Sequence, residues 1–316
     1  MTTSFSRRSL LASASSAAMI ASLPRTSSAA GVEQTVPFSS GTAPPRSEVP
    51  AQACDSHIHI FSTRFPASPH WKGEAVSDSD VPAYRLFQKR IGTSRAVVVT
   101  PSTYGVDNRA TLDGVAQLGG SARAVVVVDT DIADAELKRM ADEGAVGIRV
   151  NFVTPQSWGA TTAERLQTMA KKIAPLGWHV QVYMTADQIV EHETVLSGLP
   201  TTLVIDHLGR LPPATGTDHR ADAVIRRLLD GGRTWMKLSG AYFFGGPPDY
   251  ADAREVARAY IAAAPERVVW GSDWPHPTEN EKPDDAVLFD LLSEWAPDDA
   301  TRHRILVENP ATLYGF

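Results

Sequence analysis

The stretch AVVVVDTDIADAELKRMADEGAVGIRVNF, residues 124–152, contains a complete strand–helix–strand unit. Its first run, 124–129, is almost continuously β-branched, which is typical of a parallel strand buried on both faces. Residues 133–143 have the apolar spacing of an amphipathic helix, and a glycine follows the end of that helix. A second apolar run at 146–152 completes the unit, because two parallel strands need a crossover of about this length.

The same alternation of apolar runs and helical patterns covers the chain after residue 50. We predict strands at 53–60, 96–100, 124–129, 146–152, 179–183, 203–207, 235–238 and 268–273. We predict helices at 107–118, 133–143, 161–174, 186–196, 221–229, 251–263 and 285–295. Eight such strands favour an α/β fold, a (β/α)8 TIM barrel formed as a single domain by residues 51–316. A doubly wound open sheet is the alternative, and its dinucleotide-binding form loses weight because no glycine-rich loop follows the first strand.

The N-terminus has the features of an export signal. Arg7 and Arg8 precede a mildly apolar Ala/Ser/Leu stretch, and a run of small residues ends at Ala30. We therefore predict a twin-arginine-type signal peptide over residues 1–30, followed by a flexible lead-in over 31–50. The apolar stretch is too short to span a bilayer as a stable anchor. The expected location is periplasmic or secreted, and a cytoplasmic protein with a disordered tail is the alternative.

Composition and charge exclude several classes of protein. A net charge of −6 argues against a surface for nucleic acid or anionic membranes, which attract clustered Lys and Arg. A small anionic substrate is compatible with this charge, since one or two local arginines can hold it. The single cysteine, Cys54, excludes an intramolecular disulfide and a multi-cysteine metal site. The sequence does not indicate the oligomeric state.

Two histidines face the same side of the first predicted strand. His57 and His59 are separated by one residue, so the strand period of two sends both imidazoles to one face. Active sites of (β/α)8 barrels lie at the carboxyl ends of the strands. The pair is therefore either a set of packed, hydrogen-bonded core residues or one side of an active site.

Polar residues also end several other predicted strands: Arg149 and Asn151, Tyr183, His207 with Arg210 beyond it, and Asp273 with His276 beyond it. Each has a structural explanation when taken alone, because a single buried histidine is usually a hydrogen-bonded core residue and an aspartate often caps a turn. Burying three histidines and Asp273 at one end of a barrel without a function would be costly. We therefore interpret His57, His59, His207 and Asp273 as a catalytic cluster.

Eight motifs in order are similar to those of the amidohydrolase superfamily, in the branch of 2-pyrone-4,6-dicarboxylate lactonase and sugar-lactone-processing enzymes. They are CDSHIHIF, GVDNRATL, GIRVNFV, LGWHVQVY, DHLGR, WGSDWPHP, KPDDAVL and ENPATLYGF, and they extend from Cys54 to Phe316. The resemblance implies a hydrolase that opens a lactone, with Asp273 as the general base for water. The histidines of the cluster would polarise the lactone carbonyl, directly or through a metal.

The resemblance leaves the cofactor open. The four cluster residues match the ligands of mononuclear Zn²⁺ or Mn²⁺ amidohydrolases, whereas some members of the lactonase branch need no metal. Arg149 stands at the strand-four position where two-metal members have a bridging Lys or Glu, so a binuclear site is not expected.

Arg149 and Arg210 are the expected grips for a substrate carboxylate, since a planar guanidinium donates two parallel hydrogen bonds. Asn151, Tyr183 and His276 are the other expected substrate contacts, with Tyr183 on a ring or carbonyl oxygen. Two loops that carry further arginines in the dicarboxylate lactonase contain TPQ at 154–156 and AYFFGG at 241–246 here. We therefore expect a small carboxylate-bearing lactone as the partner, rather than the pyrone dicarboxylate itself.

Three alternatives remain open at this point. A lactone isomerase or a metal-dependent decarboxylase of the same superfamily would use the same four residues. An exported solute-binding or scaffold protein on a degenerate barrel would not need a base, and the presence of Asp273 argues against it.

Overall fold

The computed structural model describes residues 35–74, 77–154, 161–247 and 250–316, and these described residues belong to one compact unit. The signal peptide expected over residues 1–30 lies outside these ranges and stays a prediction. Within them, no helix has both the length and the apolar character needed to cross a bilayer.

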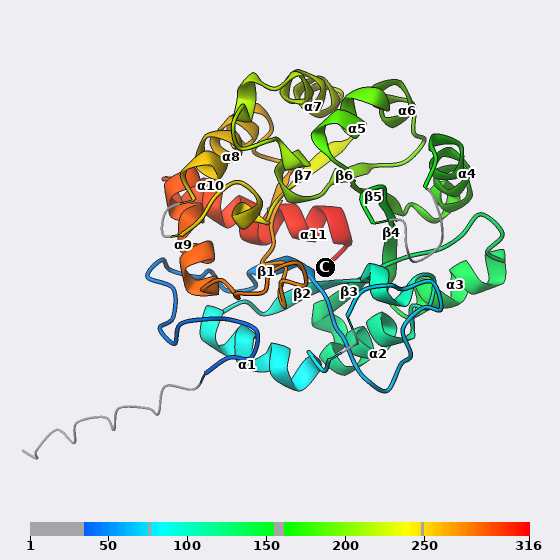
Figure 1. Cartoon of the computed structure of the whole chain (residues 1–316), viewed down its shortest axis with the longest axis horizontal. Coiled ribbons are helices and arrows are strands. Elements are labelled where there is room, and N and C mark those ends of the chain that lie inside the picture. The colour runs from blue at the N-terminus through cyan, green and yellow to red at the C-terminus, as the bar shows by residue number, and fades with distance from the viewer. Residues whose placement is uncertain (1–34, 75–76, 155–160, 248–249) are drawn as a thin grey trace, which may run out of the picture. The chain divides into compact units, whose positions relative to one another are not determined.

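Eight parallel strands form the barrel predicted from the sequence. They are β1 (Cys54–Ile58), β2 (Arg95–Val99), β3 (Ala122–Val126), β4 (Ala145–Asn151), β5 (His179–Tyr183), β6 (Leu203–Ile205), β7 (Thr234–Leu238) and β8 (Val268–Trp270). Each strand pairs with the next along the chain (Figure 1). A bridge between Ile58 and Trp274 links β1 to the segment after β8, with the His59 amide donating to the Trp274 carbonyl at 2.8 Å. The barrel is therefore nearly closed.

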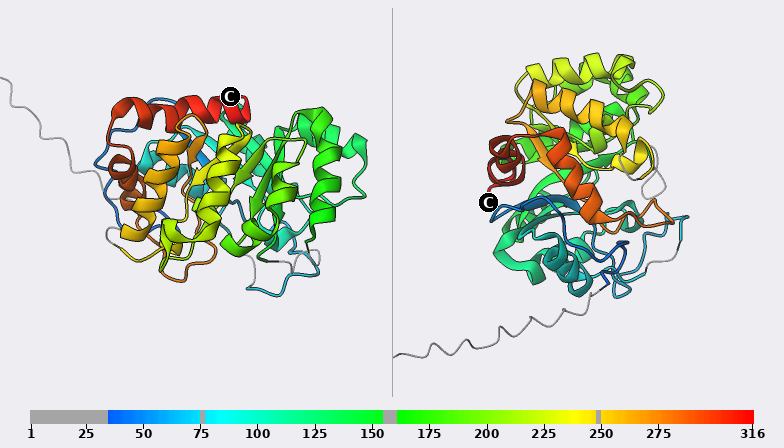
Figure 2. Two further views of the ribbon diagram at one scale, coloured as in Figure 1. Left: turned by 90° about the horizontal axis from the view of Figure 1, so that it is seen from above. Right: turned by 90° about the vertical axis from the view of Figure 1, so that its left-hand side faces the viewer.

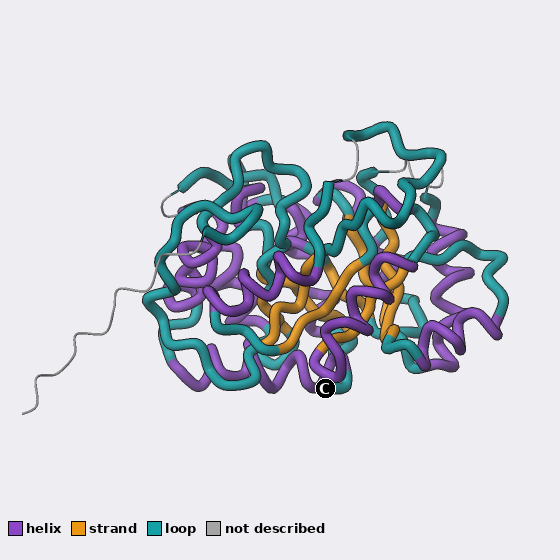
Figure 3. Tube along the Cα trace, turned by 90° about the horizontal axis from the view of Figure 1, so that it is seen from below, coloured by secondary structure: helices purple, strands orange, loops and turns teal. Residues whose placement is uncertain are grey.

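Helices surround this sheet, as the views from the side and from below show (Figures 2 and 3). They are α1 (Val81–Ile91), α2 (Arg109–Leu118), α3 (Asp134–Asp142), α4 (Ala163–Ile173), α5 (Ala186–Glu191), α6 (Glu193–Ser197), α7 (Arg220–Asp230), α8 (Ala251–Ala263), α9 (Asp285–Trp295), α10 (Asp299–His303) and α11 (Asn309–Tyr314). The sequence did not predict α1, α10 or α11, and the helix expected at 186–196 is divided into α5 and α6 around His192.

Strand residues alternate between the barrel interior and the helical layer. Val97 packs in an interior cluster with Cys54 and Tyr314, whereas Val98 packs in the main core. Tyr314 belongs to α11, so the C-terminal helix covers the end of the barrel where the strands begin. Helix α11 does not cover the opposite end of the barrel, where the strands finish and where the active site is expected.

Two features differ from the sequence prediction. The register of β1 shifts between Asp55 and Ile58, so the regular alternation expected along the first strand is interrupted around His57, and His59 follows the last residue of the strand. Residues 35–50 are also not a flexible lead-in, because they pack on the barrel. The amides of Arg46 and Ser47 donate to the Asp290 carboxylate of α9 at 3.1 and 2.9 Å.

Candidate active site

A cavity of ≈ 420 Å³ opens at the carboxyl ends of the strands. Six residues predicted for the site line it: His59, Arg149, Asn151, Tyr183, His207 and Asp273. Aromatic and small hydroxyl side chains from the surrounding loops complete much of the wall, among them Phe61, Trp71, Phe243, Ser79, Ser102 and Thr278. The cavity is large enough for a small organic substrate.

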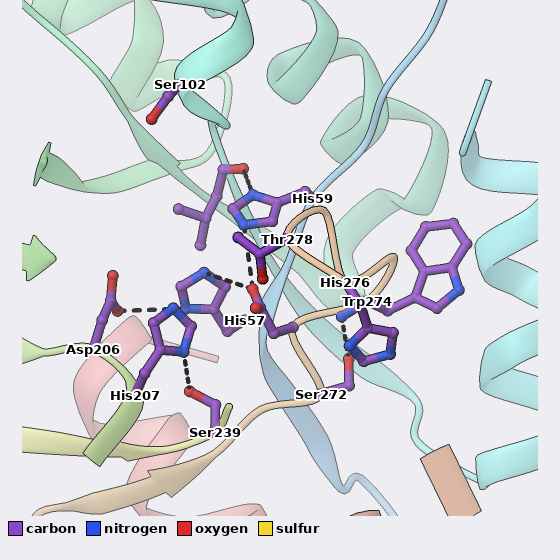
Figure 4. Close-up of polar contacts among 12 residues, drawn as sticks. His57, His59, Ser102, Asp206, His207, Ser239, Ser272, Trp274, His276 and Thr278 are labelled. Atoms are coloured by element: carbon purple, nitrogen blue, oxygen red, sulfur yellow. Dashed lines mark hydrogen bonds and ion pairs between the residues drawn. The ribbon is translucent and has the colours of Figure 1, made fainter. Parts of the chain in front are cut away.

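The structure brings the four residues of the predicted cluster together, and three of them, His59, His207 and Asp273, line this cavity. Figure 4 shows how the rings of the three histidines lie beside one another. The His57 ring centroid is 5.0 Å from that of His59 and 4.8 Å from that of His207. Oδ1 of Asp273 is 3.5 Å from Nε2 of His57 and 3.3 Å from Nε2 of His59. All four side chains are buried.

We had expected His207 and Asp273 at the ends of strands, but both residues reach the cluster from turns. Strand β6 ends at Ile205 and β8 at Trp270. His207 has φ +52° and Asp273 has φ +65°, in the left-handed region that such residues seldom adopt. Backbone strain of this kind is concentrated at functional sites, where the surrounding structure maintains it.

Hydrogen bonds orient two of the imidazoles. Nδ1 of His59 lies 2.7 Å from the Val99 carbonyl, which only accepts, so this nitrogen carries a proton and Nε2 faces the cluster. Nδ1 of His207 lies 2.9 Å from the Ser239 hydroxyl. Burial lowers the pKa of His207 to about 4. His207 is therefore neutral at physiological pH.

The carboxylate of Asp273 stays ionised beside these rings. Burial alone would raise the pKa of Asp273, but interactions with His207, His59 and His57 hold it well below its usual range. Burial and the charge of Lys237 lower the pKa of His57 well below its usual value. The cluster thus joins the neutral imidazoles of His57 and His207 to one carboxylate, which is a suitable pairing for accepting a proton from water.

A second buried carboxylate, Asp206, lies beneath the cluster and was missed by the sequence interpretation. Its Oδ2 accepts from Nε of Arg149 at 3.1 Å and from Nε2 of Gln181 at 3.2 Å. Its Oδ1 is 3.4 Å from Nδ1 of His57. Burial would raise the pKa of Asp206, but its interactions with His57 and Arg149 hold it well below its usual range. Its place directly before His207 in DHLGR was the only signal in the sequence.

Lys237 of β7 was also missed, and its ammonium lies fully buried under His57. Nζ donates to the Ser56 carbonyl at 2.8 Å and to Oε1 of Gln181 at 2.7 Å, and lies 3.3 Å from Nδ1 of His57. Burial lowers its pKa to about 8. The signal was a lysine inside an otherwise apolar run, WMKL at 235–238, since buried lysines are rare without partners.

The expected substrate contacts are placed unequally. Arg149 lines the cavity, and its guanidinium lies 4.9 Å from the Tyr183 ring centre. Nε of this group donates a hydrogen bond to Asp206. Asn151 donates a hydrogen bond to the Ser102 hydroxyl at 2.7 Å, and its side-chain oxygen accepts hydrogen bonds from the backbone amides of Val153 and Thr154. The Asn151 side chain therefore shapes the loop after β4. Arg149 is thus the better placed of the two to bind a ligand.

Arg210 and His276 are not among the described residues that line the cavity. The Arg210 guanidinium donates to the Tyr183 hydroxyl and lies 4.6 Å from the Phe243 ring centre. His276 is fully buried, with Nε2 3.1 Å from both oxygens of Asp285. Both residues therefore stand behind the cavity wall rather than in it.

Tyr242 is a further residue that the sequence interpretation did not single out. Its hydroxyl donates to Oδ2 of Asp273. It belongs to a short 3₁₀ turn, Ala241–Phe243, which follows Gly240 at φ +68°. A Cβ at Gly240 would approach the Phe243 ring to 2.7 Å, so glycine is needed for this turn to fold against the site.

The cluster has the donor set of a site for one divalent cation. Ligand atoms of His57, His59 and Asp273 lie within 4.8 Å of one another, and so do those of His57, Asp206 and His207. In the described part of the chain, Nε2 of His57 and Oδ1 of Asp273 are buried without a hydrogen-bond partner. Imidazole nitrogens and a carboxylate are suitable ligands for such a cation, so the residues fit one metal ion.

Comparisons with known proteins agree with this geometry. The family model described as Amidohydrolase matches residues 54–316. A 2-pyrone-4,6-dicarboxylate hydrolase of Comamonas testosteroni is 36% identical over 283 residues, 85% of this chain and 92% of that protein. A D-galactarolactone isomerase of Agrobacterium fabrum is 32% identical over 280 residues, 87% of this chain and 94% of that one.

The fold comparison gives the same result. The crystal structure of an apo protein from Agrobacterium tumefaciens superposes with a TM-score of 0.78 at 32% identity. The match covers 86% of this chain and 98% of that one. The family model and the first relative confirm the resemblance to the lactonase branch found in the sequence. The chain belongs to the amidohydrolase family.

Proposed function

We propose that the protein is a hydrolase that opens the ring of a small, carboxylate-bearing lactone. The observation that carries this proposal is the position of Asp273, whose ionised carboxylate faces the rings of His57 and His59 at the floor of the cavity. A general base beside polarising groups is what hydrolysis of an ester requires. The similarity to a named lactone hydrolase supports the same reaction.

In the proposed reaction, the oxygen of a water molecule attacks the lactone carbonyl carbon while Oδ1 of Asp273 accepts a proton from that water. The histidines of the cluster stabilise the negative charge that develops on the carbonyl oxygen. The bond between the acyl carbon and the ring oxygen then breaks, and Asp273 returns the proton to the leaving alkoxide. The product is one hydroxy acid, because the leaving group stays attached to the rest of the molecule.

His57, His59 and Asp273, with His207 beside them, are the residues that would hold Zn²⁺ or Mn²⁺. Such an ion supplies Lewis-acid polarisation of the carbonyl and lowers the pKa of a bound water. The roles of Asp273 as base and Arg149 as substrate grip are the same with or without it.

Arg149 is the proposed grip for the substrate carboxylate. Its side chain is only 6% exposed, and Asp206 and the Tyr183 ring hold it against the cavity. A buried, oriented guanidinium binds a carboxylate with little loss of side-chain entropy. Elsewhere the wall combines hydroxyl and aromatic side chains with the charged groups of Glu74, Glu279 and Lys282.

A panel of lactones followed with a pH indicator tests the proposal. We expect release of one equivalent of acid per lactone consumed, with preference for rings that carry a carboxylate. Parallel assays with a chelator, and with Zn²⁺ or Mn²⁺ restored, decide whether a metal is required. Conversion to a second lactone without acid release would instead support the activity named for the Agrobacterium fabrum relative, and release of carbon dioxide would indicate a decarboxylase.

A further inference from the structure

The two oxygens of the Asp273 carboxylate have different surroundings. Oδ1 faces Nε2 of His57 and Nε2 of His59 and has no hydrogen-bond partner among the described residues. Oδ2 accepts a hydrogen bond from the hydroxyl of Tyr242. A carboxylate held at one oxygen presents the other in a fixed direction.

Tyr242 is itself held in place on its other side. Its ring meets the His276 ring edge to face, with centroids 5.5 Å apart and planes at 87°. His276 is fully buried and fixed by Asp285, whose two oxygens both lie 3.1 Å from Nε2. Tyr242 also packs against Phe243, with ring centroids 4.8 Å apart. These contacts restrict the phenol to the orientation that reaches Asp273.

The direction of the hydrogen bond between Tyr242 and Asp273 follows from their charges. Asp273 is ionised and can only accept, so the Tyr242 hydroxyl donates. The contact is therefore a charge-assisted hydrogen bond, which is stronger than one between neutral groups.

We propose that Tyr242 is a positioning residue for the reaction, which holds Oδ2 of Asp273 so that Oδ1 alone is presented to the attacking water. This inference rests on the proposed hydrolysis. Tyr242 is not among the described residues that line the cavity, whereas its neighbour Phe243 is. Tyr242 thus acts through Asp273, and the loop after β7 is turned towards the base rather than towards the substrate.

Tyr242→Phe removes the hydroxyl and keeps the ring that packs on His276. We expect kcat to fall at least about tenfold, because misdirecting a catalytic group costs rate while leaving substrate binding intact. KM should stay within about twofold of the wild-type value, since the proposal gives Tyr242 no contact with the substrate. A raised KM with unchanged kcat would show a substrate contact instead, and unchanged values of both would overturn the proposal.

Tyr104→Phe is the matched control. The Tyr104 hydroxyl also makes buried hydrogen bonds, accepting from the Ser62 amide at 2.8 Å and donating to the Ser62 carbonyl at 3.2 Å. Tyr104 is not among the described cavity-lining residues. Loss of the Tyr104 hydroxyl should lower Tm without changing kcat, so a fall in kcat confined to Tyr242→Phe separates positioning from a general effect of losing a hydrogen-bonded tyrosine hydroxyl.

A double-mutant cycle on thermal stability tests the contact without any substrate. In the wild-type background, Tyr242→Phe should lower Tm. In the Asp273→Ala background the hydroxyl has lost its acceptor, so the same substitution should lower Tm less, or raise it. Additive changes in Tm would overturn the contact. This result does not depend on turnover, so it distinguishes failure of the positioning role from failure of the proposed lactone hydrolysis.

Discussion

The buried ammonium of Lys237 makes folding stability depend on pH in a direction that the structure fixes. Lys237 is fully buried beneath His57, and burial lowers its pKa from 10.5 to about 8. In the unfolded chain the lysine keeps its ordinary pKa. Between these two values the unfolded state binds a proton that the folded state has released. Stability must therefore rise as pH increases through this window.

The size of the effect follows from the shift. A change from 10.5 to about 8 corresponds to about 3 kcal/mol, at 1.36 kcal/mol for each pKa unit. This penalty on the charged form is fully present below pH 8 and is relieved by pH 10.5. The negative charge of Asp206 already offsets part of the cost of burial within this shift.

The assay compares the wild type with Lys237→Met by urea unfolding at several values between pH 7 and 10.5. Other groups that titrate in this range are common to both proteins, so the difference between their free energies of unfolding isolates Lys237. We expect this difference to shift in favour of the wild type by about 3 kcal/mol as pH rises. A difference that stays constant, or that shifts towards Lys237→Met, would refute a buried lysine with a lowered pKa.

Two further substitutions test the site. In Gly271→Ala, the new Cβ would lie 2.8 Å from Cβ of His57, so we expect a loss of about 1–3 kcal/mol of stability together with lower turnover. Gly120→Ala is its control, because no atom lies within 4 Å of the added Cβ, and equal effects of the two would contradict the close contact. Arg149→Lys keeps a cation beside Asp206 but loses the planar fork, and should raise KM for carboxylate-bearing lactones about tenfold or more. An equal change in KM for uncharged lactones would remove Arg149 from the role of carboxylate grip.

The barrel could be predicted from the sequence because its strands are buried on both faces. Runs such as 124–129 stay apolar without alternation, and that pattern distinguishes parallel strands from solvent-exposed ones. Helix α1 was not predicted, although Asp80 caps its first turn by accepting from the Ala83 amide and Gly92 ends it at φ +97°. Local signals of this kind fix the ends of a helix, but they are short and common elsewhere in sequences.

The clustering of His57, His59, His207 and Asp273 could be predicted because the barrel gathers the carboxyl ends of its strands at one mouth. The local geometry could not, since His207 and Asp273 are delivered by left-handed turns that no strand pattern encodes. The residues behind the cluster were also missed. Lys237 and Tyr242 acquire their roles only through contacts made across the barrel, to Ser56 and to Asp273.

The central claim is that Asp273 is the base that activates water. Asp273→Asn keeps the shape of the side chain and removes its basicity, so kcat on the best lactone should fall at least about a hundredfold. Circular dichroism and binding of the hydroxy-acid product should remain close to those of the wild type. Measuring kcat for this variant is the most direct test. Turnover near the wild-type rate would contradict the mechanism.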